Sequence, residues 1–449
     1  MSFPRYPKYK DSGVEWLGQV PEHWSVLPCR AIVNEKTAKN EGAKCEDYLS
    51  LMANIGVIPY AEKGDVGNKK PDDLSKCKLV SKGDFVINSM NYGIGSYGIS
   101  DYDGVCSPVY IVLKPQNSVV ESRFAFRIFE NSAFQTYAQS FGNGILEHRC
   151  AINWDILKSI GVGIPPRCEQ DEILAFLDRE TAKIDGLVAE QKRLIELLKE
   201  KRQAVISHAV TKGLNPDAPM KPSGIEWLGD VPRHWKLVTV RRMIEQIEQG
   251  WSPECLSRSA EENEWGVVKS GCVNRGVFNP QENKALPETL VPISDLEIHC
   301  GDVLISRASG SPELVGSTAF ISETRSKLML SDKIFRVSIA SGVNGRFFVA
   351  TFNSHVLRNQ IERAISGADG LANNLPQSAL KSFFLAVPPI FEQTEIVDYL
   401  AAKTAKFDTL TAEAQRAIDL LQERRTALIS AAVTGQIDVR QMGERHEAA

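Results

Sequence analysis

The chain repeats a stretch of its own sequence. Residues 12–24 read SGVEWLGQVPEHW and residues 223–235 read SGIEWLGDVPRHW, with ten of thirteen positions identical. An internal repeat constrains the architecture of a whole chain, so it takes precedence over local patterns. The segments that follow the two copies, 25–163 and 236–386, resemble each other only in scattered patches. A fixed frame carrying two divergent segments predicts one scaffold that presents two binding specificities.

A second repeat covers two long segments that lack helix breakers. Residues 169–211 contain no proline and one glycine, Gly186, and residues 392–434 contain neither. Apolar residues recur in both at a spacing of about 3.5 residues, which predicts a coiled-coil seam. The predicted seam comprises Ile173, Leu177, Ile184, Leu187, Leu194, Leu198, Val205, Ile396, Leu400, Phe407, Leu410, Ala417, Leu421 and Leu428. Two matched helices separated by a globular segment most simply pack antiparallel; the alternative is that each packs on its own domain.

These patterns predict an α+β protein with a pseudo-twofold internal repeat, in which two long antiparallel coiled-coil helices join two globular domains. The expected parts are a first globular domain with the first Trp motif at 1–163, a first helix at 164–212, a linker with the second Trp motif and a second globular domain at 213–386, a second helix at 387–435, and a tail at 436–449.

The repeated motif is rich in tryptophan. Four of the seven tryptophans lie in it: Trp16, Trp24, Trp227 and Trp235. A pair of tryptophans around a turn could stack nucleic-acid bases. Such a block more often forms a hydrophobic clasp that fixes the entry of the chain into a domain. We favour the clasp, and we interpret His23 and His234 as structural histidines.

Composition narrows the class of protein. No stretch approaches the ~20 apolar residues of a membrane span, and the start, MSFPRYPKYKDSG, has no apolar signal segment. Nine isolated cysteines without a CxxC pair suit a reducing compartment. We therefore expect a cytoplasmic protein. The net charge of −4 argues against simple electrostatic DNA binding, so partner subunits would supply part of the phosphate contacts.

The divergent segments alternate strand patterns with Gly-rich turns, which is typical of mixed α+β domains. Residue types that contact bases or phosphates gather in these turns at corresponding places in both segments. The candidate DNA-contacting residues are Lys69, Asn88, Ser89, Asn91, Tyr92, Asn143, Arg149, Trp251, Lys269, Arg275, Arg307, Ser309, Asn373 and Asn374. For each of them, an ordinary structural role in a turn is the alternative.

The sequence carries no recognisable catalytic motif. It contains no GxxxxGK[ST] phosphate loop, no GxSxG elbow, no HExxH helix and no GxGxxG after a strand pattern. The four-ligand spacing of a zinc site is also absent. We therefore expect no metal, no cofactor and no catalytic residue in this chain. A recognition or assembly component is the better prediction.

The order of these parts resembles the specificity (S) subunit of type I restriction–modification systems. SGVEWLGQVPEHW, the segments GDFVINS (83–89) and GDVLISR (301–307), and the blocks IPPRCEQDEI and VPPIFEQTEI carry the resemblance, which covers essentially the whole chain. It implies that each divergent segment is a target recognition domain. Each domain would read one half of a bipartite gapped DNA site, and the helices would set the spacing.

The resemblance also implies partners. Two methyltransferase (M) subunits would dock around the helices, and two restriction (R) subunits would complete the nuclease. S-adenosylmethionine, ATP and Mg²⁺ would be cofactors of those partners, and adenine methylation by base flipping would occur there. Two alternatives remain: a restriction system with fused cleavage and methylation in its partner, and a coiled-coil adaptor without nucleic-acid contact.

Overall fold

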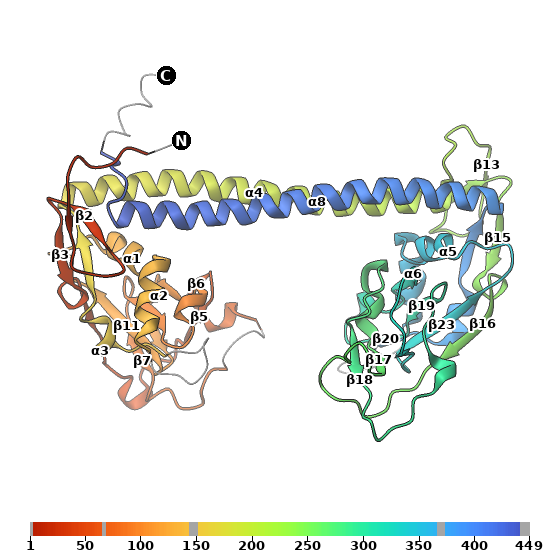
Figure 1. Ribbon diagram of the computed structural model, residues 1–449, viewed down its shortest axis with the longest axis horizontal. Coiled ribbons are helices and arrows are strands. Elements are labelled where there is room, and N and C mark those ends of the chain that lie inside the picture. Colours follow the sequence, from red (N-terminus) through yellow and green to blue (C-terminus); the bar gives the residue numbers. More distant parts are fainter. Residues whose placement is uncertain (1–2, 65–68, 143–150, 366–372, 441–449) are drawn as a thin grey trace. The chain divides into compact units, whose positions relative to one another are not determined.

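The chain forms two compact units (Figure 1). The computed structural model describes residues 3–64, 69–142, 151–365 and 373–440. Unit 1 consists of residues 1–192 and 416–449, and unit 2 consists of residues 193–415. Both boundaries fall inside the long helices. Each unit therefore combines one globular domain with one part of each helix, whereas the predicted domain limits separated the domains from the helices.

Unit 1 is built around an antiparallel four-stranded sheet. Its strand order is β4 (Val33–Glu35), β11 (Tyr110–Pro115), β8 (Phe85–Asn88) and β9 (Tyr97–Ile99). Four antiparallel pairs accompany it: β1 (Tyr9–Asp11) with β2 (Gln19–Pro21), β3 (Ser25–Pro28) with β12 (Gly161–Ile164), β5 (Leu49–Met52) with β6 (Gly56–Pro59), and β7 (Lys78–Val80) with β10 (Gly104–Cys106). The short helices are α1 (Ser122–Glu130), α2 (Ser132–Ser140) and α3 (Trp154–Leu157).

The core of unit 1 lies on both faces of β8. Phe85 and Ile87 point into a large apolar cluster with Phe124 and Phe129 of α1, while Val86 points into a smaller cluster on the opposite face. Successive strand residues face opposite sides, so a strand covered on both faces reads as a continuous apolar run. This explains the uninterrupted apolar run of FVI at 85–87.

Unit 2 has the same central sheet, but the strands that accompany it differ. Its antiparallel sheet has the order β16 (Ile244–Gln249), β23 (Ile334–Ile339), β19 (Val303–Ser306) and β21 (Thr318–Phe320). The accompanying strands are β13 (Met220–Pro222) with β14 (Asp230–Pro232), β15 (Lys236–Thr239) with β25 (Phe384–Val387), β20 (Ala308–Ser309) with β24 (Asn373–Asn374), and the group β18 (Asn283–Ala285), β17 (Gly266–Val268) and β22 (Leu328–Met329). Its short helices are α5 (Gly345–Phe352), α6 (His355–Ala364) and α7 (Gln377–Ser382).

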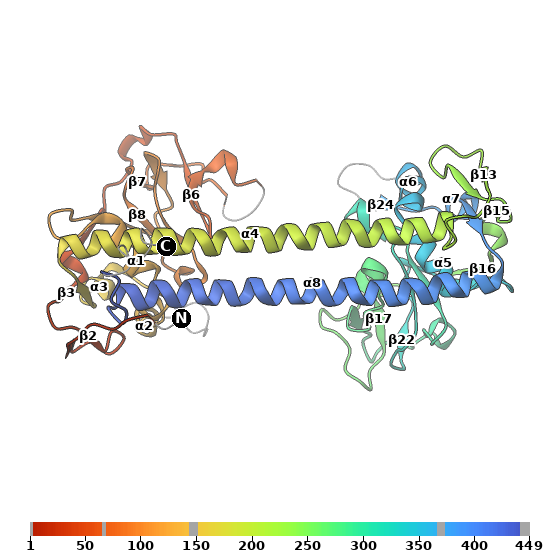
Figure 2. The ribbon, with the colours of Figure 1, turned by 90° about the horizontal axis from the view of Figure 1, so that it is seen from above.

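Two long helices run through both units: α4 (Arg167–Lys212) and α8 (Ile390–Val433). Each helix begins directly after a pair of prolines, Pro165-Pro166 and Pro388-Pro389. Proline is tolerated at the start of a helix, where its missing backbone N–H would have no partner within the helix. In unit 1 the early part of α4 packs on the late part of α8, and in unit 2 the late part of α4 packs on the early part of α8 (Figure 2). The helices are therefore antiparallel. The predicted fold class is confirmed.

The predicted seam is correct at the ends of the helices and wrong in the middle. Leu187, Leu194 and Leu410 are 47%, 42% and 37% exposed, respectively. The most regular series of inward-facing residues instead recurs every eleven residues. Such a repeat corresponds to 3.67 residues per turn, which is close to the 3.6 residues per turn of an α-helix. The series comprises Ile173, Ile184, Ile195 and Ile206 in α4, and Ile396, Ile418 and Ile429 in α8, with the half-buried Phe407 at the intervening position. A heptad drifts off the buried face after Ile184, because the helices keep to the longer repeat.

The remaining predicted seam residues are buried or half-buried. Four are buried or packed on the cores near the ends of the helices: Leu177, Leu400, Leu421 and Leu428. Leu198 is buried, whereas Val205 and Ala417 are half-buried. Of the helices in the described residues, none is long and apolar enough to cross a membrane.

Candidate nucleic-acid interface

A buried carboxylate fastens the first Trp motif to the first long helix. Glu169, at the start of α4, is 3% exposed and accepts a hydrogen bond of 2.9 Å from Trp24 Nε1. His23 Nε2 lies 2.7 Å from its second oxygen, and the Tyr6 hydroxyl donates to the first. Burial, reinforced by this hydrogen bond, raises the pKa of Tyr6 well above its ordinary value, so the phenol stays protonated and donates.

The second copy of the motif is built in the same way. Glu392, at the start of α8, accepts a 3.0 Å hydrogen bond from Trp235 Nε1, and His234 Nε2 lies 2.8 Å from its other oxygen. Trp24 and Trp235 are each 1% exposed, so neither can stack on a base. The clasp interpretation and the structural role of both histidines are confirmed.

The glutamine that follows each of these glutamates attaches the globular domain. Gln170 Oε1 accepts a 2.7 Å hydrogen bond from the backbone N–H of Glu121, directly before α1. Gln393 Oε1 accepts a 2.8 Å bond from the backbone N–H of Asn344, directly before α5. The same two-residue motif therefore ties a Trp clasp with its glutamate and a domain helix with its glutamine, once in each unit. This explains why EQ recurs with the Trp motif.

Three predicted DNA-contacting residues in unit 1 build a turn instead. Asn88 is the last residue of β8 and Ser89 follows it; both are buried, and Ser89 Oγ donates to the Val109 carbonyl. Asn88 Oδ1 accepts from the backbone N–H of Met90. Tyr92 is fully buried and its hydroxyl donates to the Phe129 carbonyl at 2.6 Å. Because these side chains are buried and hydrogen-bonded within the domain, the prediction that they contact DNA is wrong in this structure.

The other predicted residues of unit 1 are less constrained. Lys69 is exposed, and Asn91 is half-buried beside the turn that holds Tyr92. Asn143 and Arg149 lie outside the described residues. A contact of Lys69 or Asn91 with DNA stays a prediction.

In unit 2 the structure brings four predicted residues together. The short strands β20 and β24 pair Ala308 with Asn374 and Ser309 with Asn373, beside Arg307 at the end of β19. Arg307 Nη1 donates to the Asp332 carbonyl at 3.1 Å, and its guanidinium lies 5.9 Å from the Phe335 ring centroid. A two-strand pairing between segments 65 residues apart in sequence thus assembles one polar surface. That these residues contact DNA stays a prediction.

Sequence reasoning missed the neighbours of Arg307. Lys333 forms a 3.0 Å ion pair with Asp332, and Gln249 Nε2 donates to the Asp332 carbonyl at 3.2 Å. The Lys333 side chain is 47% exposed, which makes it a further cation on this surface. The segment SDK at 331–333 carries no motif, and only the strand pairing places it beside Arg307.

The remaining predicted residues of unit 2 lie elsewhere in its domain. Trp251 is half-buried and packs on a small apolar cluster around Met329, which is a structural role. Lys269 forms a 3.5 Å ion pair with Glu282 and is half-buried. The Arg275 side chain lies outside the described part of the chain. Within that part, no group of three His, Cys, Asp or Glu residues could hold a metal ion.

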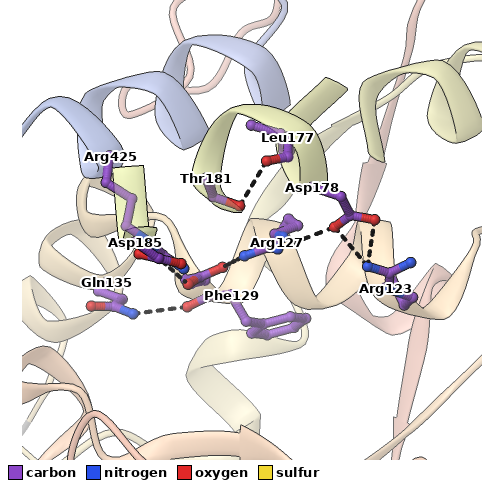
Figure 3. Close-up of polar contacts among 10 residues, drawn as sticks. Arg123, Arg127, Phe129, Gln135, Leu177, Asp178, Thr181, Asp185 and Arg425 are labelled. Carbon is purple, nitrogen blue, oxygen red and sulfur yellow. Dashed lines mark hydrogen bonds and ion pairs between the residues drawn. The ribbon is translucent and has the colours of Figure 1, made fainter. Parts of the chain in front are cut away.

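A charged cluster joins the domain of unit 1 to both long helices (Figure 3). Arg123 of α1 donates to both oxygens of Asp178 at 2.7 Å, and Arg127 forms a 2.5 Å ion pair with Glu130. Arg425 of α8 lies 3.4 Å from Glu130 and 3.1 Å from Asp185 of α4. One arginine therefore links both helices to the domain.

Comparison with known proteins gives a consistent family. Residues 39–197 match the family described as "Type I restriction modification DNA specificity domain". The EcoEI specificity subunit of Escherichia coli is 31% identical over 241 residues, which cover 53% of this chain and 40% of that subunit. The EcoKI specificity subunit of Escherichia coli strain K12 is 23% identical over 440 residues, or 94% of this chain and 90% of that subunit.

A solved structure supports the fold. One chain of a structure described as "Structural basis underlying complex assembly and conformational transition of the type I R-M system" covers 92% of this chain and 98% of its own length, with a TM-score of 0.66 and 15% identity. At that identity the likeness concerns the fold alone. Together with the sequence matches, it defines a duplicated two-domain, two-helix protein. In sequence and in fold, the chain is similar to specificity subunits of type I restriction–modification systems.

Proposed function

We propose that this chain is the non-catalytic DNA-recognition subunit of a type I restriction–modification complex. Each globular domain would read one half of a bipartite gapped DNA site, and the long helices would set the separation of the half-sites. The observation that carries the proposal is that both units share the same Trp–His–Glu clasp, whereas the residues at the equivalent strand end differ. A shared frame that carries two domains with different loops suits a protein that recognises two different DNA half-sites.

The divergence is visible at the end of β8 and β19. The matching segments GDFVINS and GDVLISR place Ser89 and Arg307 at the same step after the strand. Ser89 is buried and bonded to a carbonyl, whereas Arg307 lies on a polar surface beside Lys333. An arginine can bind guanine bidentately, and a buried serine cannot reach a base. We therefore propose that the two domains read DNA with different sets of loops.

The long helices support the docking of two M subunits. Unit 1 exposes Leu187 of α4 and Leu420 of α8, which are 47% and 65% exposed. The residues 223 positions away, Leu410 and Leu197, are 37% and 44% exposed in unit 2. Each unit thus presents the same pair of solvent-exposed leucines, one on each helix. Two equivalent apolar surfaces suit two copies of one partner, since identical subunits require equivalent interfaces.

We propose that catalysis lies in the partners. The M subunits would bind S-adenosylmethionine and the R subunits would use ATP and Mg²⁺, in the cytoplasm of the host. Removal of the exposed leucines tests the docking surface. Leu187→Glu with Leu410→Glu should abolish co-purification of M, because each glutamate would be desolvated in the interface. Unchanged co-purification would contradict this surface; Glu172→Lys, on the same helix and exposed, is the matched control.

The recognition role is tested by methylome sequencing of a host that expresses this chain with its neighbouring methyltransferase, against a strain that lacks this gene. A bipartite gapped motif with methyladenine on both strands, absent without the gene, is the expected result. Exchange of residues 25–163 for those of a relative should then change one half of the motif. An active methyltransferase without any such motif would favour the adaptor alternative.

A further inference from the structure

A cavity in unit 2 gathers positive charge between its domain and its helix segments. The cavity measures about 800 Å³ and is lined by Arg202, Arg325 and Arg346, with Glu323 as its one lining carboxylate among the described residues. Arg325 is held in place by the carbonyls of Glu264 and Ser326. The lining side chains carry three positive charges and one negative charge, and Arg202 is also paired with Asp408 outside the lining.

The first of two differences from unit 1 concerns Arg346. This residue lies 223 positions after Arg123, in the same place on the first domain helix. Arg123 is neutralised by Asp178 at 2.7 Å. The position equivalent to Asp178 is Ala401, which lines the cavity. Within the described residues Arg346 has no ion pair; its Nη2 donates to Ser322 Oγ at 3.0 Å and its guanidinium lies 4.7 Å from the Phe320 ring centroid.

The second difference concerns Arg202, which is equivalent to Arg425. Arg425 lies between two carboxylates, Asp185 and Glu130. Arg202 keeps the first, as a 3.6 Å ion pair with Asp408, but the position equivalent to Glu130 is Asn353. Arg346 and Arg202 each lack a carboxylate partner that the equivalent arginine has in unit 1, and both line the same cavity.

We propose that this cavity binds a phosphate group. Arg346 is exposed and its guanidinium presents N–H donors, and the Ser322 hydroxyl adds a further polar group beside it. A tetrahedral phosphate offers oxygens in several directions and can accept from two arginines and a hydroxyl at once, whereas one planar carboxylate is satisfied by a single arginine, as Asp178 shows in unit 1. The phosphate would come from the DNA backbone, which rests on the proposed function, or from a free nucleotide.

One substitution tests this site without changing the rest of the unit. Ala401→Asp restores the carboxylate that neutralises the equivalent arginine in unit 1, and the position is exposed on α8. Ala402→Asp makes the same change of charge one residue further along the exposed helix, outside the cavity lining. The full-length chain would be titrated calorimetrically with inorganic pyrophosphate, and separately with a random-sequence 20-base-pair duplex over a range of salt concentrations.

The expected result is pyrophosphate binding that Ala401→Asp weakens at least tenfold and Ala402→Asp leaves unchanged. If the natural source is the DNA backbone, Ala401→Asp also lowers the salt slope of duplex binding by about one. A loss of pyrophosphate binding with an unaltered slope assigns the site to a free nucleotide. Absence of pyrophosphate binding by the parent chain, or equal effects of both variants, overturns the proposal without touching the proposed recognition function. If Ala401→Asp fails to fold, Arg346→Ala replaces it.

Discussion

The attachment of the domain to the long helices differs between the two units, although the frame is shared. In unit 1 a chain of ion pairs through Arg127, Glu130 and Arg425 links α1 to both helices. In unit 2, Gln203 Nε2 donates to the Asn353 carbonyl at 2.8 Å, and the backbone N–H of His355 donates to Ser207 Oγ. The clasp glutamates and their neighbouring glutamines are the same in both. The frame therefore fixes where a domain attaches, and each domain determines which contacts make the attachment.

The largest effect is expected at buried frame positions, and it should be equal in the two units. Ile195→Ala and its repeat partner Ile418→Ala should each cost about 2–5 kcal/mol, because both side chains are buried in the helix pair. Hydrogen exchange of the helix peptides measures the loss. Leu194→Ala, at an exposed neighbouring position, should cost far less. A larger loss of stability on Leu194→Ala than on Ile195→Ala would support the heptad seam instead.

Replacement of the clasp glutamate should cost more stability in unit 1 than in unit 2. Glu169→Ala leaves two buried donors, Trp24 Nε1 and the Tyr6 hydroxyl, without their acceptor, whereas Glu392→Ala leaves only Trp235. Because each unpaired buried donor costs about 1–3 kcal/mol, the first substitution, with two such donors, should cost about twice as much as the second, with one. Exchange protection at the start of α4 and of α8 reports each cost. Equal costs would remove Tyr6 from the clasp; exposed Glu172→Ala is the control.

Substitution of Arg307 should weaken DNA binding, whereas substitution of its counterpart Ser89 should not. Arg307→Ala in the assembled complex should weaken specific binding by about 1–3 kcal/mol if the guanidinium binds a base bidentately. Ser89→Ala should leave DNA binding unchanged, since the hydroxyl is buried. Competition titrations with specific and random duplexes measure both. An equal loss on the two duplexes would make Arg307 a phosphate contact.

The smallest effect is expected when unit 1 is given the residue of unit 2 in the charged cluster. Glu130→Asn removes the carboxylate shared by Arg127 and Arg425, and the half-buried site should lose about 1–2 kcal/mol of local stability. Exchange of α1 amides at low and high salt tests this. The loss should shrink with salt, because ion pairs are screened. Asp178→Ala, at a more exposed pair, should cost below about 1 kcal/mol.

The repeat, the fold class and the two helices could be predicted from the sequence, because they leave local or periodic signals. The seam could not be placed beyond Ile184, since heptad and eleven-residue series share Ile173 and Ile184 and part only afterwards. Tyr92 was misassigned because an aromatic residue in a Gly-rich turn looks the same whether it faces solvent or the core. The polar surface around Arg307 depends on the β20–β24 pairing, for which two-residue strands carry no pattern.

The hydrogen bonds of Gln170 and Gln393 have a consequence for how such chains diversify. In both units the glutamine binds a backbone N–H directly before the first domain helix, not a side chain. Every amino acid except proline supplies that amide. An incoming domain of unrelated sequence can therefore be accepted by recombination without a matching partner residue, provided that its first helix begins at the same distance from the frame.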